Sequence, residues 1–303
     1  MSADMAVYDA RQTAELLGFP QLVAALRDAC LQYANGAILA PERQVVPFPQ
    51  GGVMLSMPAT AHDLAIHKLV NVVASNRDRA LPTIHGLVSA FDGQTGRALF
   101  VLDGPTVTAR RTAAISMLGL QTFLAEAPRS VALLGTGAQA AGHLDALAAI
   151  FPGLSVHVVG TSAAKTQGFA HDHRGLPLRI QAADSVPDTV DAVITLTTSA
   201  VPVYGKAAKK GVLIIGVGAY KPELAEIAPA TLHASRLYVD DMAGAHHEAG
   251  DLIQAKVDWS EVKPLSAALA DGIGFDKPIV FKTVGCAAWD LAAARCALEA
   301  LRR

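Results

Sequence analysis

The chain lacks several features that define particular classes of protein. No apolar run approaches about 18 residues, and Met1–Asp9 has no basic stretch followed by an apolar block, so we expect neither a membrane span nor a secretory leader. The 3 cysteines show no C-x-x-C spacing, which is typical of reduced thiols in a cytosolic protein. Aromatic residues make up only 5% of the chain, the net charge is −2, and the basic residues form no continuous stripe, so nucleic acid is not an expected partner.

Apolar residues are abundant, at 51% of the 303 residues, which favours well-buried domains and an oligomer interface. The most informative stretch is 131–140, V-A-L-L-G-T-G-A-Q-A. Four apolar residues indicate a buried parallel strand, and Gly135 and Gly137 indicate a tight turn. Ala140 occupies the third position of the motif G-x-G-x-x-G/A, which requires a small residue. Helical spacing over 139–150 follows, so the motif predicts a dinucleotide pyrophosphate at a helix N-terminus.

Apolar runs alternate with helical stretches after this point, which predicts a doubly wound, parallel sheet of the Rossmann type. The expected strands are 131–134, 156–159, 192–196, 212–215, 237–239 and 279–282. Earlier in the chain, helical spacing over 9–32 is followed by short β-like runs over 44–100, with a hairpin turn at 92–96. These runs predict an antiparallel or mixed sheet.

A long helix over 106–125 leads into the nucleotide domain, and a helical tail over 286–301 is expected to pack on the first part of the chain. We therefore predict an α/β protein with a discontinuous α+β domain for substrate binding and dimerisation, 1–112 with 284–303. The NAD(P)-binding domain would be 113–283.

The second predicted strand of the nucleotide domain does not end in Asp or Glu, the residue that commonly binds the ribose 2′-hydroxyl of NAD. Thr161, Ser162 and Lys165 stand there instead and are able to bind a 2′-phosphate by charge-assisted hydrogen bonds. A helix cap with a solvated lysine is the alternative. We expect NADPH as the cofactor, with NADH also used.

Three cationic residues lie in apolar or small-residue surroundings: Arg43, Lys68 and Arg111. A buried cation is costly unless it meets an anion, and a small carboxylate substrate would supply one. Local acids or a solvated head group are the alternative for each residue. Periodicity alone does not choose between Arg110 and Arg111, because successive helix positions point about 100° apart.

Several motifs in order give the chain a resemblance to the ornithine cyclodeaminase/mu-crystallin family. These motifs are Met57-Pro-Ala, Lys68 with Asn71, Leu81-Pro-Thr, Asp92-Gly-Gln-Thr-Gly, Thr108-Ala-Arg-Arg-Thr-Ala-Ala, Gly135-Thr-Gly-Ala-Gln, Gly216-Val-Gly-Ala-Tyr-Lys-Pro-Glu, and Phe281-Lys-Thr-Val-Gly with Asp290. The resemblance implies a homodimer in which Arg43, Lys68 and Arg111 bind the substrate carboxylate. Within the family the arginine just before Thr has this role, which selects Arg111.

The remaining candidate site residues are assigned largely by the same resemblance. The resemblance implies that Thr83 is a substrate-side hydroxyl. Lys68 is the candidate for assisting proton transfer, and a water is the alternative. His85 and Asp290 are further candidates near the reacting groups; the alternatives are a hydrogen-bonded structural histidine for His85 and a helix cap or surface ion pair for Asp290. The cofactor contacts are Thr112, Gly135, Gly137, Ala138, Gln139, Thr161, Ser162, Lys165, Thr197, Val217 and Thr283. No metal is expected, because His246 and His247 are adjacent and lack an H-x-x-H or H-x-x-x-H partner.

One absence separates the activities that occur within the family. Cyclodeaminases carry an Asp after the strand that corresponds to 212–215, whereas this chain has Gly218-Ala219-Tyr220 and no carboxylate until Glu223. Ring-closing deamination needs a general base there, whereas imine reduction does not. We therefore expect a reductase that converts Δ1-pyrroline-2-carboxylate and Δ1-piperideine-2-carboxylate to L-proline and L-pipecolate, in proline metabolism and lysine catabolism. The alternatives are an alanine-type dehydrogenase, an ornithine cyclodeaminase, and a non-catalytic binding protein of the mu-crystallin kind.

Overall fold

The computed structural model describes residues 5–303; residues 1–4, which begin the segment expected to lack a leader, lie outside the described residues. The chain divides into unit 1, Met1–Arg111 with Cys286–Arg303, and unit 2, Thr112–Gly285. It passes from the first to the second within one helix, α3 (Gly104–Phe123). The expected borders, after residues 112 and 283, lie one and two residues from these. Among residues 5–303, no helix is long and apolar enough to cross a bilayer.

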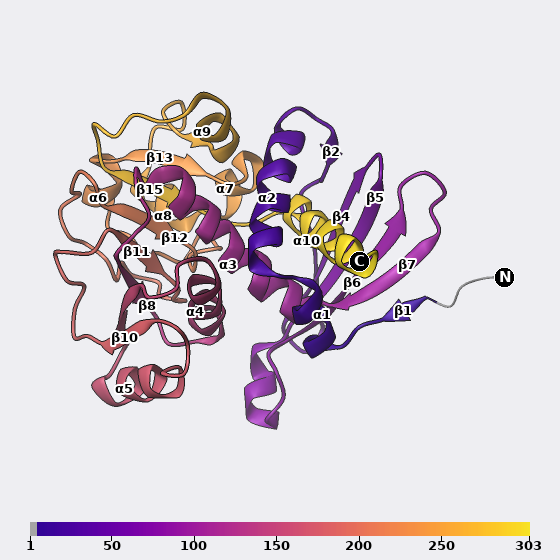
Figure 1. Ribbon diagram of the computed structural model, residues 1–303, viewed down its shortest axis with the longest axis horizontal. Coiled ribbons are helices and arrows are strands. Elements are labelled where there is room, and N and C mark those ends of the chain that lie inside the picture. The colour runs from indigo at the N-terminus through magenta and orange to yellow at the C-terminus, as the bar shows by residue number, and fades with distance from the viewer. Residues whose placement is uncertain (1–4) are drawn as a thin grey trace. The chain divides into compact units, whose positions relative to one another are not determined.

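Unit 2 is built on an eight-stranded sheet in which every paired strand is parallel, so the predicted doubly wound α/β architecture is confirmed. The order is β10-β9-β8-β11-β12-β15-β13-β14, and Figure 1 shows most of these strands in sequence from β13 down to β10. The strands are β8 (Ser130–Leu134), β9 (Ser155–Val159), β10 (Arg179–Ala182), β11 (Ala192–Thr195), β12 (Leu213–Gly216), β13 (Arg236–Val239), β14 (Lys263–Pro264) and β15 (Ile279–Lys282). The helices are α4 (Ala138–Ile150), α5 (Ala163–Asp172), α6 (Pro229–His233), α7 (Met242–Glu248), α8 (Gly250–Ala255) and α9 (Leu265–Asp271).

The central strands of this sheet are buried along nearly their whole length, and they are apolar except for Ser130 at the amino end of β8 and Thr195 and Lys282 at the carboxyl ends of β11 and β15. All residues of β11, β12 and β15 are buried, as are Val131–Leu134 of β8. Such continuous burial is typical of a parallel strand that is covered on both faces, which explains why these runs could be recognised in the sequence. Strand β8 lies between β9 and β11, so the chain winds outward from β8 in both directions. In open α/β sheets, ligands bind at the carboxyl ends of the strands beside such a switch point.

Unit 1 contains a seven-stranded mixed sheet, in which β1 and β7 are parallel and the other paired strands antiparallel. Its strands are β1 (Ala6–Val7), β2 (Ile38–Leu39), β3 (Gln44–Pro47), β4 (Val53–Ala61), β5 (Leu64–Val72), β6 (Ile84–Asp92) and β7 (Ala98–Asp103). Its helices are α1 (Ala10–Leu16), α2 (Phe19–Ala34) and α10 (Ala287–Leu301), with a 3-10 helix, η1, at Ala74–Arg79. The tail helix α10 packs on α2 and on β4 and β5.

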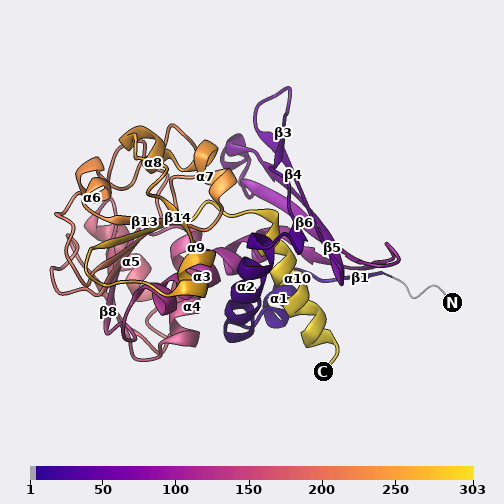
Figure 2. The same cartoon turned by 90° about the horizontal axis from the view of Figure 1, so that it is seen from above.

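The two faces of the unit 1 sheet differ in what covers them. In β5, alternate residues are buried, and they include Ile66, Lys68 and Val70. Figure 2 shows α1, α2 and α10 together on one side of this sheet, with the other side uncovered within the unit. Because side chains alternate along a strand, Lys68 lies on the helix-covered face, and His67 and Leu69 lie on the open face.

Candidate active site

The predicted cofactor residues of unit 2 follow the carboxyl ends of five neighbouring strands of the parallel sheet. Gly135, Gly137, Ala138 and Gln139 follow β8, Thr161, Ser162 and Lys165 follow β9, Thr197 follows β11, Val217 follows β12, and Thr283 follows β15. Parallel strands end at one edge, so these residues form a row along that edge, on both sides of β8. Thr112, at the start of unit 2, is buried in α3.

The glycine turn after β8 has the backbone that a pyrophosphate site requires. Gly135 has φ +128°, and a Cβ there would lie 2.7 Å from the carbonyl oxygen of Leu196. Gly137 caps α4 without a side-chain hydrogen bond, and a Cβ on Gly137 would meet no atom within 4 Å. The first turn of α4 contains no acidic residue. The helix N-terminus therefore fits an approaching phosphate, and Gly137 leaves room for it.

The corner after β9 shows the capping arrangement that the sequence left open. Ser162 is the N-cap of α5, and its hydroxyl accepts a hydrogen bond from the backbone N–H of Lys165 at 3.4 Å. Thr161, Ser162 and Lys165 are all exposed. The cap leaves the Thr161 hydroxyl and the Lys165 ammonium group accessible, so a role in binding a 2′-phosphate stays a prediction.

The ends of β11 and β12 meet at a buried carboxylate, that of Glu226. Its Oε1 accepts hydrogen bonds from the backbone N–H of Thr197 at 2.6 Å and from the Thr197 hydroxyl at 2.9 Å. Its Oε2 accepts from the backbone N–H groups of Gly218 at 2.6 Å and Ala219 at 3.1 Å, and from the Thr195 hydroxyl at 2.9 Å. Burial raises the pKa of Glu226, and the positive charge of Lys282 opposes that rise.

A second buried carboxylate, Asp240, fixes the loop after β15. Its Oδ2 accepts from the Thr283 hydroxyl at 2.6 Å and the Gly285 N–H at 2.9 Å, and its Oδ1 from the Val284 N–H at 2.9 Å. Asp240 is thus a positioning residue for Thr283.

On the glycine-turn side, the His143 imidazole is fully buried, and burial lowers its pKa to about 4. His143 Nδ1 donates to the carbonyl oxygen of Gln139 at 2.7 Å, which leaves Nε2 to accept from the Ser116 hydroxyl at 2.9 Å. A neutral imidazole thus connects α3 to the first turn of α4.

Unit 1 brings three of the predicted residues into one buried cluster, formed by Lys68, Arg111 and Asp290. Lys68 is 2% exposed, Arg111 6% and Asp290 0%. Lys68 Nζ donates to Asp290 Oδ1 at 3.0 Å, and Arg111 Nε lies 3.5 Å from the same oxygen. Arg111 Nε and Asp290 Oδ2 make no hydrogen bond within residues 5–303.

The cluster carries more positive than negative charge. Burial lowers the pKa of Lys68 to about 8; Asp290 opposes that fall, and the positive charges of Arg111 and Arg43 add to it. One carboxylate thus serves two buried cations, with a third, half-buried Arg43 close enough to act on Lys68. Such an excess of buried positive charge is unfavourable unless a bound anion neutralises it. The arrangement is suited to binding a small carboxylate.

The structure also separates residues that the sequence left together. Arg110 Nε donates to the carbonyl oxygen of Leu17 at 2.9 Å, and its guanidinium lies 4.0 Å from the centroid of the Phe19 ring. Arg111, and not Arg110, therefore belongs to the cluster. Within residues 5–303, no interaction joins the Thr83 side chain to the cluster, although the Thr83 carbonyl accepts from Val73 N–H at 2.8 Å.

His85 lies away from the cluster. Lys68 pairs with Val88 across β5 and β6, so Val88 shares the face of Lys68 and His85, three residues earlier, lies on the opposite face. His85 is exposed there. The expectation that His85 reaches the pocket finds no support within unit 1.

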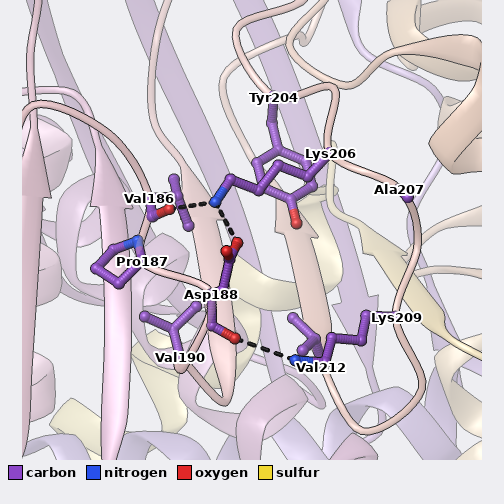
Figure 3. Close-up of a pocket in the computed structure, with 9 residues that line it drawn as sticks. All are labelled: Val186, Pro187, Asp188, Val190, Tyr204, Lys206, Ala207, Lys209 and Val212. Atoms are coloured by element: carbon purple, nitrogen blue, oxygen red, sulfur yellow. Dashed lines mark hydrogen bonds and ion pairs between the residues drawn. The ribbon is translucent and has the colours of Figure 1, made fainter.

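A cavity of about 300 Å³ lies at the other end of the parallel sheet (Figure 3). Its wall includes Val190 and Val212, which precede β11 and β12, so it lies at the amino ends of these strands, opposite the row of cofactor residues. Lys206 Nζ donates to the Val186 carbonyl oxygen and to the Asp188 carboxylate, both at 2.5 Å. Lys209 Nζ donates to the Asp188 carbonyl oxygen at 3.2 Å, so both ammonium groups in the wall already have acceptors and the cavity offers no unpaired cation to an anion.

His246 and His247 belong to no cluster of metal-ligating side chains in the part of the chain that the structure describes. Within residues 5–303, no group of three His, Cys, Asp or Glu side chains is placed to hold an ion. His246 instead stacks on Trp259, with ring centroids 4.1 Å apart.

The sequence pattern of the ornithine cyclodeaminase/mu-crystallin family matches residues 4–303. The chain belongs to this family. The Δ1-pyrroline-2-carboxylate/Δ1-piperideine-2-carboxylate reductase of Azospirillum brasilense is 56% identical over 301 residues, which cover 97% of this chain and 96% of the relative. Δ1-pyrroline-2-carboxylate reductase 2 of Burkholderia ambifaria is 54% identical over 296 residues, covering 97% and 95%.

Solved structures of the family show the same fold. The Δ1-pyrroline-2-carboxylate reductase of Thermococcus litoralis, solved with NADH and L-proline, superimposes with a TM-score of 0.87 at 24% identity, over 98% of each chain. At this identity the likeness establishes the fold alone. It agrees with the doubly wound sheet described above.

The sequence alone did not reveal two buried carboxylates that accept hydrogen bonds from the loops of the predicted cofactor residues. Glu226 and Asp240 are both almost inaccessible, at 0% and 4% exposure. Glu226 lies three residues beyond Glu223, and nothing in the local sequence distinguishes a buried acid from a solvated one. The P-E-L-A-E run from 222 to 226 offered no signal beyond the fact that Glu226 precedes the apolar Ile227.

Proposed function

We propose that this chain is an NAD(P)H-dependent reductase of cyclic ketimine carboxylates, with Δ1-pyrroline-2-carboxylate and Δ1-piperideine-2-carboxylate as substrates. L-proline and L-pipecolate are the products. The observation that carries the proposal is the buried cluster of Lys68, Arg111 and Asp290, whose excess positive charge calls for an anionic ligand. The relative that is 56% identical is named as a reductase of both imines, and the relative that is 54% identical as a reductase of Δ1-pyrroline-2-carboxylate, which supports the choice of substrate.

Each residue of the cluster has a separate role in this reaction. The planar guanidinium of Arg111 presents two N–H groups to the substrate carboxylate, and Lys68 adds a compact charge beside it. With a pKa of about 8, Lys68 holds a proton at neutral pH and can also release it to the imine nitrogen. Asp290 fixes both cations, and Arg43 adds to the attraction for an anion. When bound, NAD(P)H supplies the hydride that the C=N carbon accepts.

The geometry disfavours cyclodeamination. Gly218-Ala219-Tyr220 follow β12, in the segment where the family resemblance places the acid of cyclodeaminases, and the nearby carboxylate of Glu226 is fully buried. Both oxygens of Glu226 accept hydrogen bonds from the protein, so neither is available as a general base for a substrate amine.

We propose NADPH as the preferred cofactor, with NADH also accepted, since no carboxylate opposes a 2′-phosphate at Thr161, Ser162 and Lys165. Lys165→Ala should raise KM for NADPH about tenfold and leave KM for NADH unchanged. The lysine ammonium group would make its charge-assisted contact with the 2′-phosphate, which NADPH carries and NADH lacks. Equal changes for the two cofactors would contradict this preference.

We also propose a homodimer in the cytoplasm. The open face of the unit 1 sheet carries partly exposed apolar side chains, among them Leu69, Leu87 and Val101, and a face of this kind is suited to a second copy. The three buried cysteines agree with a reducing compartment.

The test of the reductase proposal is the oxidation of NADPH at 340 nm with each cyclic imine. Arg111→Ala should raise KM for the imine about 100-fold, because a buried charged hydrogen-bonding group is removed. Arg110→Ala is the matched control, since Arg110 contacts Leu17 and Phe19 and not the cluster. No turnover with either imine, from protein that binds NADPH, would refute the proposal.

A further inference from the structure

The carboxylate of Glu226 joins two loops that belong to different strands. It accepts five hydrogen bonds, two from Thr197 and one from Thr195 at the end of β11, and two from Gly218 and Ala219 at the end of β12. Three of the donors are backbone N–H groups. A single side chain therefore connects both loops.

The two loops also touch directly. A Cβ on Gly218 would lie 1.9 Å from the carbonyl oxygen of Thr197 and 2.6 Å from its nitrogen. Only glycine permits this approach. Without an acceptor between the loops, three backbone N–H groups at this contact would be left unpaired.

Glu226 is itself fixed by a second buried pair. The backbone N–H groups of Glu226 and Ile227 both donate to Asp251 Oδ1, at 2.5 and 2.9 Å. Asp251 Oδ2 lies 3.2 Å from Lys282 Nζ, and Glu226, Asp251 and Lys282 are each no more than 1% exposed. Burial of three ionisable side chains is costly, so the network has to be accurately formed to persist.

We infer that Glu226 is a positioning residue for the nicotinamide half of the cofactor, and acts by holding the Thr197 and Gly218 loops in one arrangement. The inference rests on the proposed function. A dinucleotide lies across the switch point, with its pyrophosphate at the glycine turn after β8 and one nucleotide on each side. The 2′-phosphate corner follows β9, so the nicotinamide half lies on the side of β11 and β12.

Glutamine has the shape of glutamate but cannot replace it here. Each oxygen of Glu226 accepts at least one backbone N–H, so either orientation of an amide would direct its NH₂ group at a backbone donor. Glu226→Gln should therefore shift the two loops and leave the glycine turn after β8 intact.

The experiment compares binding of NADPH with binding of 2′-phospho-ADP-ribose, which lacks the nicotinamide ring, by titration calorimetry without imine. For Glu226→Gln we expect Kd for NADPH to rise about tenfold and Kd for the fragment to stay within about twofold of wild type. Asp191→Asn is the matched control: Asp191 Oδ2 accepts from the N–H groups of Arg129, just before β8, and Ser130, its first residue, at the amino end of the sheet. In the Asp191→Asn variant, the ratio of Kd for NADPH to Kd for 2′-phospho-ADP-ribose should equal that of the wild type.

Equal weakening of both ligands by Glu226→Gln, or no change in either, would overturn the inference while leaving the reductase proposal intact. Wild-type protein that binds neither ligand would overturn both. If Glu226→Gln does not fold, Thr195→Val removes one hydroxyl donor from the same carboxylate and should change the ratio of the two Kd values about threefold. An unchanged ratio in that variant would count against the inference.

Discussion

Replacing Lys68 by methionine should make the protein more stable and less able to bind its substrate. Lys68 and Arg111 share the carboxylate of Asp290 in a buried cluster, so among residues 5–303 the cluster holds two cations and one paired carboxylate. Methionine keeps most of the length and apolar surface of the lysine stem. In Lys68→Met, Arg111 and Asp290 remain as a balanced pair.

The magnitude follows from the pKa of Lys68, which falls from 10.5 to about 8 on folding. At 1.4 kcal/mol per pH unit, the charged form costs about 3 kcal/mol of folding free energy at neutral pH. Below about pH 8 both folded and unfolded states hold the proton, and the cost is constant. Between about pH 8 and 10.5 the unfolded state binds the proton that the folded state has lost, so wild-type stability rises with pH.

Lys68→Met lacks this titration, so its advantage of about 3 kcal/mol below pH 8 should shrink towards zero as the pH approaches 10.5. Urea unfolding at about pH 7 and about pH 10, at one protein concentration, measures the difference at both ends. The same variant should lose about 100-fold in kcat/KM for the imine, because a buried charged contact to the carboxylate is gone. A variant that is less stable than wild type at pH 7, or whose advantage does not depend on pH, would refute the reasoning.

Three further predictions follow from other features of the chain. Pyrrole-2-carboxylate, a planar acid with an uncharged ring nitrogen, should bind more weakly as the pH rises through about 8, because Lys68 then loses its positive charge. Titration calorimetry at a series of pH values measures this affinity, and an affinity that does not change with pH contradicts the prediction. Gly135→Ala should cost about 2 kcal/mol of stability, because φ is +128° and the added Cβ would meet the Leu196 carbonyl oxygen; urea unfolding measures the loss, with Gly137→Ala as the unstrained control. Leu87→Lys, which alters a side chain 39% exposed on the open face, should convert the proposed dimer to monomers in sedimentation experiments, and an unchanged mass would exclude this face as the interface.

The parallel sheet could be predicted because its central strands are continuous apolar runs that contain a polar residue only at an end. The runs at 131–134, 192–196 and 279–282 correspond to β8, β11 and β15, each within one residue at either end. Strand β10 was missed, since only one of the four residues in Arg179-Ile-Gln-Ala is a large apolar residue. It lies at the edge of the sheet, where burial no longer enforces an apolar pattern.

The cationic cluster was predictable only in part. The apolar surroundings of Lys68 indicated that it needs an anion, but the partner, Asp290, lies 222 residues away. Local sequence gives no information on such a contact, because an acid in the first turn of a helix equally serves as a solvated cap. The same limit applies to Glu226, whose donors include Thr195 at the end of β11, 31 residues away, and Thr197, 29 residues away.

The position of Asp290 on the last helix has a consequence for biosynthesis. A ribosome completes unit 2, residues Thr112–Gly285, before it reaches α10, whereas unit 1 cannot be closed until that helix emerges. Until then Lys68 and Arg111 are two cations with no carboxylate between them, and their burial is opposed. The cluster proposed to bind the substrate carboxylate therefore forms last, and a chain that terminates before α10 contains the whole of unit 2 but only an incomplete cluster.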